Sequence, residues 1–336
     1  AERLALRGNV RTSWVSTRSG LNVLNFLRPQ FTGGKVAIPG GIAEAAAVLR
    51  ASDVDVLYYW EVGTDSLNYF LPFYRPTPYQ IAGWGWPSTA GHTRVDAYYS
   101  SEWLEPADGD THYVEKLVRL PASPTFYHRP PAPPVVSVRE KFGLGEGTRV
   151  YFCAQNLRKL QPAFDLVLTE LLRRDLDARL LLLCDEQPTI TEQFRARLTA
   201  AAPEVASRWR CVPRMPRPEY LSLTAGCDVL LDTPGYGGGA NTALDAAAVG
   251  APVVTWTGKY HRGRWQSAVN SRLGVEELNV ASAEAYLETC DAVARDAARR
   301  RSLSERILSR ADALFSDEQA VAAFEAAVIA AASGRG

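Results

Sequence analysis

Residues 228–245 read Asp228-Val-Leu-Leu-Asp-Thr-Pro-Gly-Tyr-Gly-Gly-Gly-Ala-Asn-Thr-Ala-Leu-Asp. A short apolar run typical of a buried strand is followed by a glycine-rich turn and then by a run typical of a helix. Free backbone N–H groups and the positive end of the helix dipole meet at such a helix start, which favours a diphosphate. The pattern therefore predicts a phosphate site at residues 237–242. The alternative, that the glycines only form a tight turn, stays open.

The same turn also fits the G-x-G-x-x-A pattern of dinucleotide-binding proteins, through Gly235, Gly237 and Ala240. That class places an acidic residue about 20 residues further along the chain. Here the corresponding region holds Thr255 and Lys259 instead. A nicotinamide or flavin cofactor is therefore disfavoured.

Strands and helices alternate on both sides of this segment. The expected strands are 149–154, 179–184, 210–212, 228–231 and 252–256, and the expected helices are 163–174, 191–201, a segment from 219, and 241–248. This alternation predicts a parallel, doubly wound sheet, whose ligands bind at the carboxyl ends of the strands. Lys159, in the loop after the first of these strands, is then expected to reach the phosphates.

The first part of the chain indicates a second α/β domain. Its expected strands are 55–60, 80–84, 95–100 and 116–120, with a helix at 41–51 before them. The proline-rich stretch 129–136 cannot continue a helix or a central strand and is the expected linker. We therefore expect an N-terminal domain at 1–135, a C-terminal domain at 136–300 and a helical tail at 301–336.

Composition narrows the function classes. The 336 residues carry 37 basic and 37 acidic side chains, which does not favour a nucleic-acid or anionic-lipid partner, and no apolar stretch is long enough to span a bilayer. The five cysteines are widely spaced and indicate buried free thiols in a reducing cytoplasm. The scattered histidines do not form a zinc pattern. The pairs Asp53/Asp55 and Asp108/Asp110 are interpreted as structural, so no metal is expected.

A tryptophan-rich segment follows the strand at 80–84. Trp84, Trp86, Thr89 and His92 combine aromatic faces with polar groups, which suits a sugar or peptide acceptor. Packing of Trp84 and Trp86 in the core is the equally open alternative.

Four ordered motifs carry a resemblance to a known family. They are Pro78-Tyr-Gln-Ile-Ala-Gly-Trp-Gly-Trp-Pro-Ser-Thr-Ala-Gly, Val114-Glu-Lys-Leu-Val-Arg-Leu-Pro, Gln155-Asn-Leu-Arg-Lys, and Leu231-Asp-Thr-Pro with Gly250-Ala-Pro-Val-Val-Thr. They resemble P-x-Q-x-x-W-x-G-Y-P-G-T-S-G, S-E-K-L-x-x-x-P, N-Q-L-Y-K and L-D-T-P with G-T-P-M-V-T of the protein O-GlcNAc transferase and SPINDLY family. The likeness runs from about residue 50 to about residue 275.

The resemblance implies an α/β fold of the GT-B type, with two Rossmann-like domains facing across a cleft and C-terminal helices covering them. It also implies a set of donor-binding residues: Asn156, Met215, Arg217, Tyr220, Gly238, Gly239, Ala240, Asn241, Thr242 and Asp245. Within this set Asp245 would hold the ribose, and Arg217 and Tyr220 would flank the nucleobase. Lys159, outside the set, would contact the donor phosphates. The chain departs from the family at Ala240, where the family has a histidine.

The implied function is an inverting, metal-independent transfer of GlcNAc or a related hexose from a UDP-sugar or GDP-sugar to a hydroxyl. The acceptor would be Ser or Thr of a protein, or a glycan. Besides Lys159, the catalytic candidates are Glu61, Asp65 and His92, because the acceptor hydroxyl needs a base. A sugar-nucleotide epimerase and a non-catalytic sugar-nucleotide-binding module are the alternatives.

Overall fold

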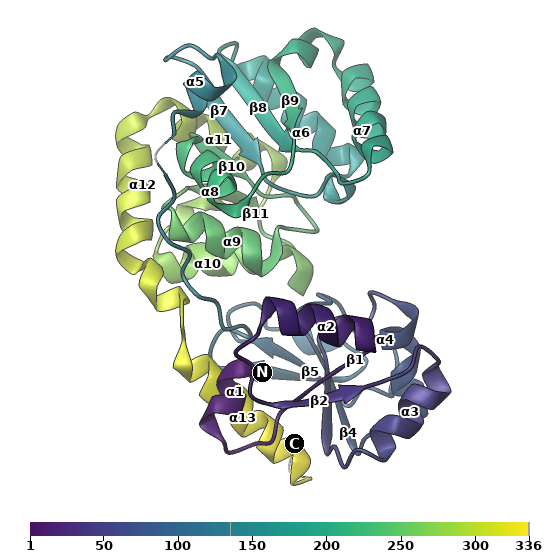
Figure 1. Cartoon of the computed structure of the whole chain (residues 1–336). Coiled ribbons are helices and arrows are strands. Elements are labelled where there is room, and N and C mark those ends of the chain that lie inside the picture. Colours follow the sequence, from purple (N-terminus) through teal and green to yellow (C-terminus); the bar gives the residue numbers. More distant parts are fainter. Residues whose placement is uncertain (135, 335–336) are drawn as a thin grey trace. The chain divides into compact units, whose positions relative to one another are not determined.

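The computed structural model describes residues 1–134 and 136–334 (Figure 1). The chain forms two compact units: unit 1 comprises Ala1–Phe126 and Asp317–Gly336, and unit 2 comprises Tyr127–Ser316. The division falls before the proline-rich stretch that was expected to hold it, and residue 135 of that stretch lies outside the described residues. The expected tail at 301–336 is not a separate body. Its residues up to Ser316 belong to unit 2 and those from Asp317 belong to unit 1.

Unit 2 is a doubly wound α/β domain with a six-stranded parallel sheet in the order β12-β11-β10-β7-β8-β9. The strands are β7 (Arg149–Cys153), β8 (Ala178–Leu183), β9 (Trp209–Val212), β10 (Val229–Leu231), β11 (Val253–Trp256) and β12 (Asn279–Val280). The helices between them are α6 (Pro162–Arg174), α7 (Pro188–Ala201), α8 (Arg217–Gly226), α9 (Gly239–Ala248), α10 (Trp265–Leu273) and α11 (Ala283–Arg295). Every strand predicted between residues 149 and 256 is confirmed.

The sheet is buried on both faces, as helices on either side of a parallel sheet require. Val150 and Phe152 of β7 pack into one hydrophobic cluster with Leu181 of β8, Leu230 of β10 and Val253 of β11. The strand order reverses between β7 and β10, because the chain leaves β7 toward β9 and returns at β10 toward β12. Ligands of doubly wound sheets bind at this reversal, which brings the loops after β7 and β10 together.

The structure adds elements that the sequence pattern did not reveal. α5 (Val138–Phe142) precedes β7, and α11 precedes α12 (Ala297–Arg310), most of which lies in the expected helical tail. Consecutive residues Trp265–Asn270 of α10 are all buried, polar ones included, so this helix shows no clear polar face. β12 has two residues, too few for a recognisable strand pattern.

Unit 1 contains two parallel sheets. β1 (Ser13–Ser16) pairs with β2 (Gly34–Ala37), and a four-stranded sheet has the order β3-β4-β5-β6. Its strands are β3 (Val56–Tyr59), β4 (Tyr79–Gly83), β5 (Ala97–Ser101) and β6 (Lys116–Leu120). The helices are α1 (Glu2–Arg7), α2 (Arg18–Leu27), α3 (Ile42–Arg50), α4 (Ser66–Phe70) and α13 (Glu318–Ala332). The four strands and the helix expected here are confirmed, and α13 lies within the expected helical tail at 301–336, whereas β1, β2, α1, α2 and α4 were not predicted.

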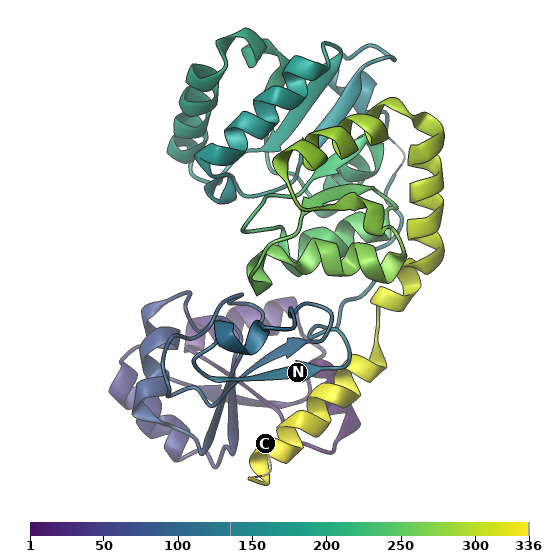
Figure 2. The same cartoon turned by 180° about the vertical axis from the view of Figure 1, so that it is seen from behind.

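The last helix belongs to the N-terminal unit because the sheet there needs a cover on its second face. Ala45, Ala46 and Leu49 of α3 pack on one face with Tyr98. Neighbouring side chains of a strand point to opposite faces, so Tyr99 lies on the other face, where Phe324, Ala327 and Val328 of α13 pack. Figure 2 shows α13 running along these strands. Among the described residues, no helix has the length and apolar character needed to cross a membrane.

Candidate functional site

A buried aspartate holds the glycine turn of unit 2 in shape. Asp232 follows β10 and is 3% exposed. Its Oδ1 accepts a hydrogen bond from the backbone N–H of Gly238 at 2.8 Å, and its Oδ2 accepts one from the Thr255 hydroxyl of β11 at 2.8 Å. Burial raises the pKa of Asp232, and these hydrogen bonds oppose that rise. The carboxylate therefore ties the turn to two adjacent strands.

Lys159 lies against the same turn. Its Nζ donates a hydrogen bond to the Gly237 carbonyl oxygen at 2.9 Å and lies 4.7 Å from the centroid of the Tyr236 ring. Burial lowers the pKa of Lys159, and the nearby charge of Asp232 raises it. The loop after β7 thus reaches the loop after β10, as the parallel sheet predicted. A positive group stands beside the turn.

Two neighbours of Lys159 shape its loop. Asn156 accepts a hydrogen bond from the Arg158 backbone N–H at 3.0 Å and so caps the short 3-10 helix that carries Lys159. Gln155 is buried and lies close to the turn. A Cβ added at Gly238 would lie only 2.3 Å from the Gln155 Nε2. A side chain at Gly238 would force Gln155 to shift and would also lie 2.8 Å from the Thr242 Cβ, and Asn156 has a structural task besides its predicted role.

The start of α9 is open. Gly239 has φ +69°, and a Cβ built there would meet no atom within 4 Å. Ala240 is buried, Asn241 is exposed and Thr242 is half-buried. The first N–H groups of a helix have no partner within the helix. These backbone donors, together with Lys159, form the charge pattern that a diphosphate needs.

A third group of predicted donor-binding residues meets further along α9. Asp245 Oδ1 accepts hydrogen bonds from Arg217 Nη2 at 2.6 Å and from the Tyr127 hydroxyl at 3.0 Å. Tyr220 is packed against the core of unit 2 near Phe152, and Met215 packs against the same cluster. The predicted residues of unit 2 therefore include two sets. One consists of the candidate phosphate-binding residues at the glycine turn, and the other consists of Arg217 and Asp245.

The tryptophan-rich segment of unit 1 is tied into its own unit. Trp86 packs against the hydrophobic core, and the Trp84 ring lies 5.3 Å from the Trp60 ring, measured between centroids. The Thr89 hydroxyl donates to Glu115 Oε2 at 2.6 Å. Trp86 and Thr89 thus have structural contacts, and an acceptor role for this segment stays a prediction.

The three candidates for the catalytic base differ in exposure and in the hydrogen bonds that their side chains already form. Asp65 caps α4 by accepting from the Asn68 backbone N–H at 2.9 Å. His92 Nδ1 accepts from the Arg94 backbone N–H at 3.3 Å, and its Nε2 is buried without a hydrogen-bond partner among the described residues. Burial lowers the pKa of His92, which favours the neutral ring. Glu61, just after β3, is exposed.

Sequence comparison then places the chain in a family. The profile of glycosyl transferase family 41 matches residues 125–323, more than half of the chain. The chain belongs to glycosyl transferase family 41. The match covers all of unit 2 and so includes the glycine turn, Lys159 and Asp245. The predicted family is confirmed.

Curated relatives agree with this family. The probable UDP-N-acetylglucosamine–peptide N-acetylglucosaminyltransferase SPINDLY of Solanum lycopersicum is 24% identical over 257 residues, which are 75% of this chain and 27% of that protein. The probable transferase SEC of Arabidopsis thaliana is 29% identical over 188 residues, 54% of this chain and 19% of that protein. The chain thus spans a minor part of the length of these relatives.

Solved structures confirm the fold class. A lysine-to-methionine mutant of the Thermobaculum terrenum O-GlcNAc transferase matches with a TM-score of 0.79 and 25% identity, covering 92% of this chain and 59% of that one. The sucrose-phosphate synthase of Thermosynechococcus elongatus matches with a TM-score of 0.65 and 14% identity, covering 98% and 90%. The second likeness concerns the fold alone. The family 41 chain therefore has the α/β architecture of GT-B glycosyltransferases.

Four residues of the candidate site, Asp232, Thr255, Gln155 and Tyr127, were not predicted from the sequence. Asp232 and Thr255 lie in the motifs quoted for the family, and a polar residue at the end of an apolar strand was a usable signal for both. Gln155 lies in the third motif and is buried under the turn. Tyr127 lies in no motif, and only the structure brings it to Asp245.

The Asp-x-Asp pairs are engaged with other side chains. Asp110 forms an ion pair with Arg119 at 2.7 Å, and Asp53 forms a long exposed one with Arg11 at 3.4 Å. Within the two described ranges, no group of three or more His, Cys, Asp or Glu side chains is placed to hold a metal ion.

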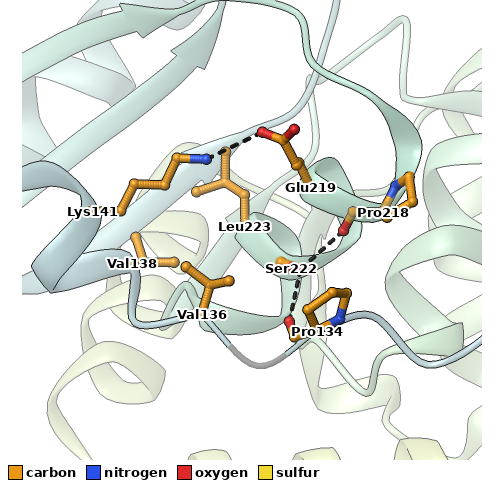
Figure 3. A pocket seen from close by; sticks show the side chains of 8 residues that line it. All are labelled: Pro134, Val136, Val138, Lys141, Pro218, Glu219, Ser222 and Leu223. Carbon is orange, nitrogen blue, oxygen red and sulfur yellow. Dashed lines mark hydrogen bonds and ion pairs between the residues drawn. The ribbon is translucent and has the colours of Figure 1, made fainter.

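An apolar pocket elsewhere in unit 2 contains none of the predicted site residues (Figure 3). Val136, Val138 and Leu223 line it, and the Ser222 hydroxyl donates to the carbonyl oxygens of Pro134 and Pro218. These contacts attach the proline-rich stretch to α8. We interpret the pocket as part of that attachment.

Replacing Lys159 with alanine is expected to weaken binding of UDP or GDP by about 1.5–3 kcal/mol, the range for a hydrogen bond to a charged group. Calorimetric titration measures the change. Lys141→Ala is the matched control, because it removes the same charge from an exposed ion pair with Glu219. Equal affinities of wild type and Lys159→Ala would show that Lys159 does not contact the nucleotide.

Proposed function

We propose that this family 41 chain is an inverting glycosyltransferase that moves GlcNAc or a related hexose from a nucleotide diphosphate to a hydroxyl, with Ser or Thr of a protein as the first acceptor to test. The names of the plant relatives describe transfer of N-acetylglucosamine to peptides. Because the chain spans 27% of the first of these proteins, the activity of the whole relative is carried over only as a proposal.

The observation that carries the proposal is the joining of Lys159 to the glycine turn. Lys159 Nζ lies 2.9 Å from the Gly237 carbonyl oxygen, two residues before α9 begins at Gly239. A departing nucleoside diphosphate carries negative charge, and a fixed ammonium group with a helix start stabilises that charge as it develops. The same geometry would also bind an intact sugar nucleotide.

The proposal includes a metal-independent mechanism. The counter-charge for the diphosphate comes from Lys159 and from the N–H groups of α9, both of which are built into the fold.

The five unpaired cysteines, four of them buried, support a reducing compartment such as the cytoplasm.

A transfer assay tests the function. The chain is mixed with UDP-GlcNAc or GDP-sugars and with candidate acceptor proteins or glycans, in the presence of a chelator. We expect a new glycosidic bond, detected as a hexose or N-acetylhexosamine mass increment, with inversion at the anomeric carbon by NMR. Activity that appears only after a divalent cation is added would contradict the metal-independent mechanism.

The same mixture separates the alternatives. An epimerase would convert the donor to an isomer without any acceptor, which NMR of the sugar nucleotide detects. A binding module would bind UDP or GDP in calorimetry and turn over none of the donors. If neither UDP nor GDP binds, the proposal that unit 2 holds the donor site is wrong.

A further inference from the structure

Asp245 has one oxygen engaged and one oxygen free. Asp245 is 7% exposed, and its Oδ1 receives both the Arg217 guanidinium at 2.6 Å and the Tyr127 hydroxyl at 3.0 Å. Arg217 Nη2 also donates to the Tyr127 oxygen at 2.7 Å, so the three side chains form a closed ring of hydrogen bonds. Asp245 Oδ2 accepts no hydrogen bond from residues 1–134 or 136–334 and is not sealed from solvent.

This ring fixes the direction of the carboxylate. A carboxylate with a single partner can change the orientation of its plane, because the last torsion of the side chain is broad. Here two donors from different segments, Tyr127 before α5 and Arg217 at the start of α8, both donate to the same oxygen, Oδ1, and so restrain the plane of the carboxylate. The lone pairs of Oδ2 therefore stay available to a ligand that donates hydrogen bonds.

Tyr127 is suited to this task at neutral pH. Burial, together with the charge of Asp245, raises the pKa of Tyr127, so the phenol keeps its proton and remains a donor. The Arg217 guanidinium lies 5.4 Å from the centroid of the Tyr127 ring, which adds a cation–π contact to the hydrogen bond. Both contacts restrain Arg217 where it meets Asp245.

We propose that Tyr127 is a positioning residue, which together with Arg217 holds Asp245 so that its free Oδ2 accepts hydrogen bonds from the ribose hydroxyls of the bound nucleotide. This rests on the proposed function, in which unit 2 binds a nucleoside diphosphate. A ribose offers two adjacent hydroxyl donors, and an oriented carboxylate oxygen discriminates strongly against a ligand that lacks one of them. Tyr127 would thus increase the selectivity of the site for ribose over deoxyribose in the bound nucleotide without touching the ligand.

The test uses the full chain in three forms: wild type, Tyr127→Phe and the control Tyr151→Phe. Tyr151 lies in β7 and is buried, and its hydroxyl has no hydrogen-bond partner in the part of the chain that the structure describes. Each form is titrated calorimetrically with UDP and GDP, and then with the 2′-deoxy and 3′-deoxy analogues of the tighter nucleotide. Thermal melting of each form checks the fold.

In wild type we expect at least one deoxy analogue to bind about tenfold or more weakly than the parent nucleotide. Tyr127→Phe is expected to weaken binding of the parent nucleotide about 3- to 10-fold. It is also expected to reduce the deoxy penalty, which is the ratio of the analogue's Kd to that of the parent nucleotide, by a similar factor. Tyr151→Phe is expected to leave both unchanged. A merely structural loss would weaken all three nucleotides equally.

The outcomes separate the two proposals. If neither UDP nor GDP binds to wild type, the proposed function fails. If the parent nucleotide binds and wild type shows no deoxy penalty, or if Tyr127→Phe retains the full penalty, the positioning role of Tyr127 is overturned while the nucleotide site stands.

Discussion

Valine in place of Gly239 is expected to abolish nucleotide binding by unit 2. Gly239 has φ +69° at the first position of α9, where a β-branched residue is strained by roughly 1–2 kcal/mol. A Cβ there would meet no protein atom within 4 Å, so the new side chain would occupy the open approach to the helix start. Several charge-assisted bonds of ~1.5–3 kcal/mol each would be lost, a loss of at least about 100-fold in affinity.

A matched control separates this effect from backbone strain. Gly143, which ends α5 in the same unit, has φ +64° and also has no atom within 4 Å of an added Cβ. Gly143→Val should therefore carry a similar strain and keep nucleotide binding. Calorimetry with UDP and GDP, together with thermal melting, compares the two variants. Normal binding by Gly239→Val would mean that the glycine turn is only architectural.

The alternating architecture of unit 2 could be predicted because its strands are short apolar runs with glycines, prolines and charges between them. That pattern located β7, β8, β9, β10 and β11 within a few residues. It also predicted that Lys159 and the glycine turn meet, since a parallel sheet brings the loops at its carboxyl edge together. The local sequence pattern was therefore sufficient to predict these strands and the two loops that follow them at the carboxyl edge of the sheet.

The parts that were not predicted depend on tertiary contacts. α13 lies in the expected helical tail, but nothing in its alanine-rich sequence indicates that it covers the sheet that contains Tyr99. Tyr127 meets Asp245 across 118 positions of sequence, and no local pattern identifies such a pair. The cap made by Asp65 and the ring contact of His92 with Phe73, whose centroids are 4.3 Å apart, likewise appear only in the folded unit.

Glu61→Gln is expected to lower the kcat of the proposed transfer by about 10²- to 10⁴-fold, the usual contribution of a general base. The Asp65 carboxylate is already used to cap α4. His92 Nδ1 accepts the Arg94 N–H, which leaves the proton of the neutral ring on Nε2 and no lone pair there for an acceptor hydroxyl. The exposed Glu61 carboxylate is therefore the candidate we propose as the base.

The comparison that tests this assignment uses three isosteric or near-isosteric changes, Glu61→Gln, Asp65→Asn and His92→Gln, with initial rates and UDP affinity measured for each. All three residues belong to unit 1, so the affinity of unit 2 for UDP should stay unchanged. A fall in kcat at constant UDP affinity then reports loss of a group that acts in the transition state. If the fall occurs in His92→Gln and not in Glu61→Gln, the histidine is the base, and the Arg94 contact must break before its Nδ1 or Nε2 can take the proton.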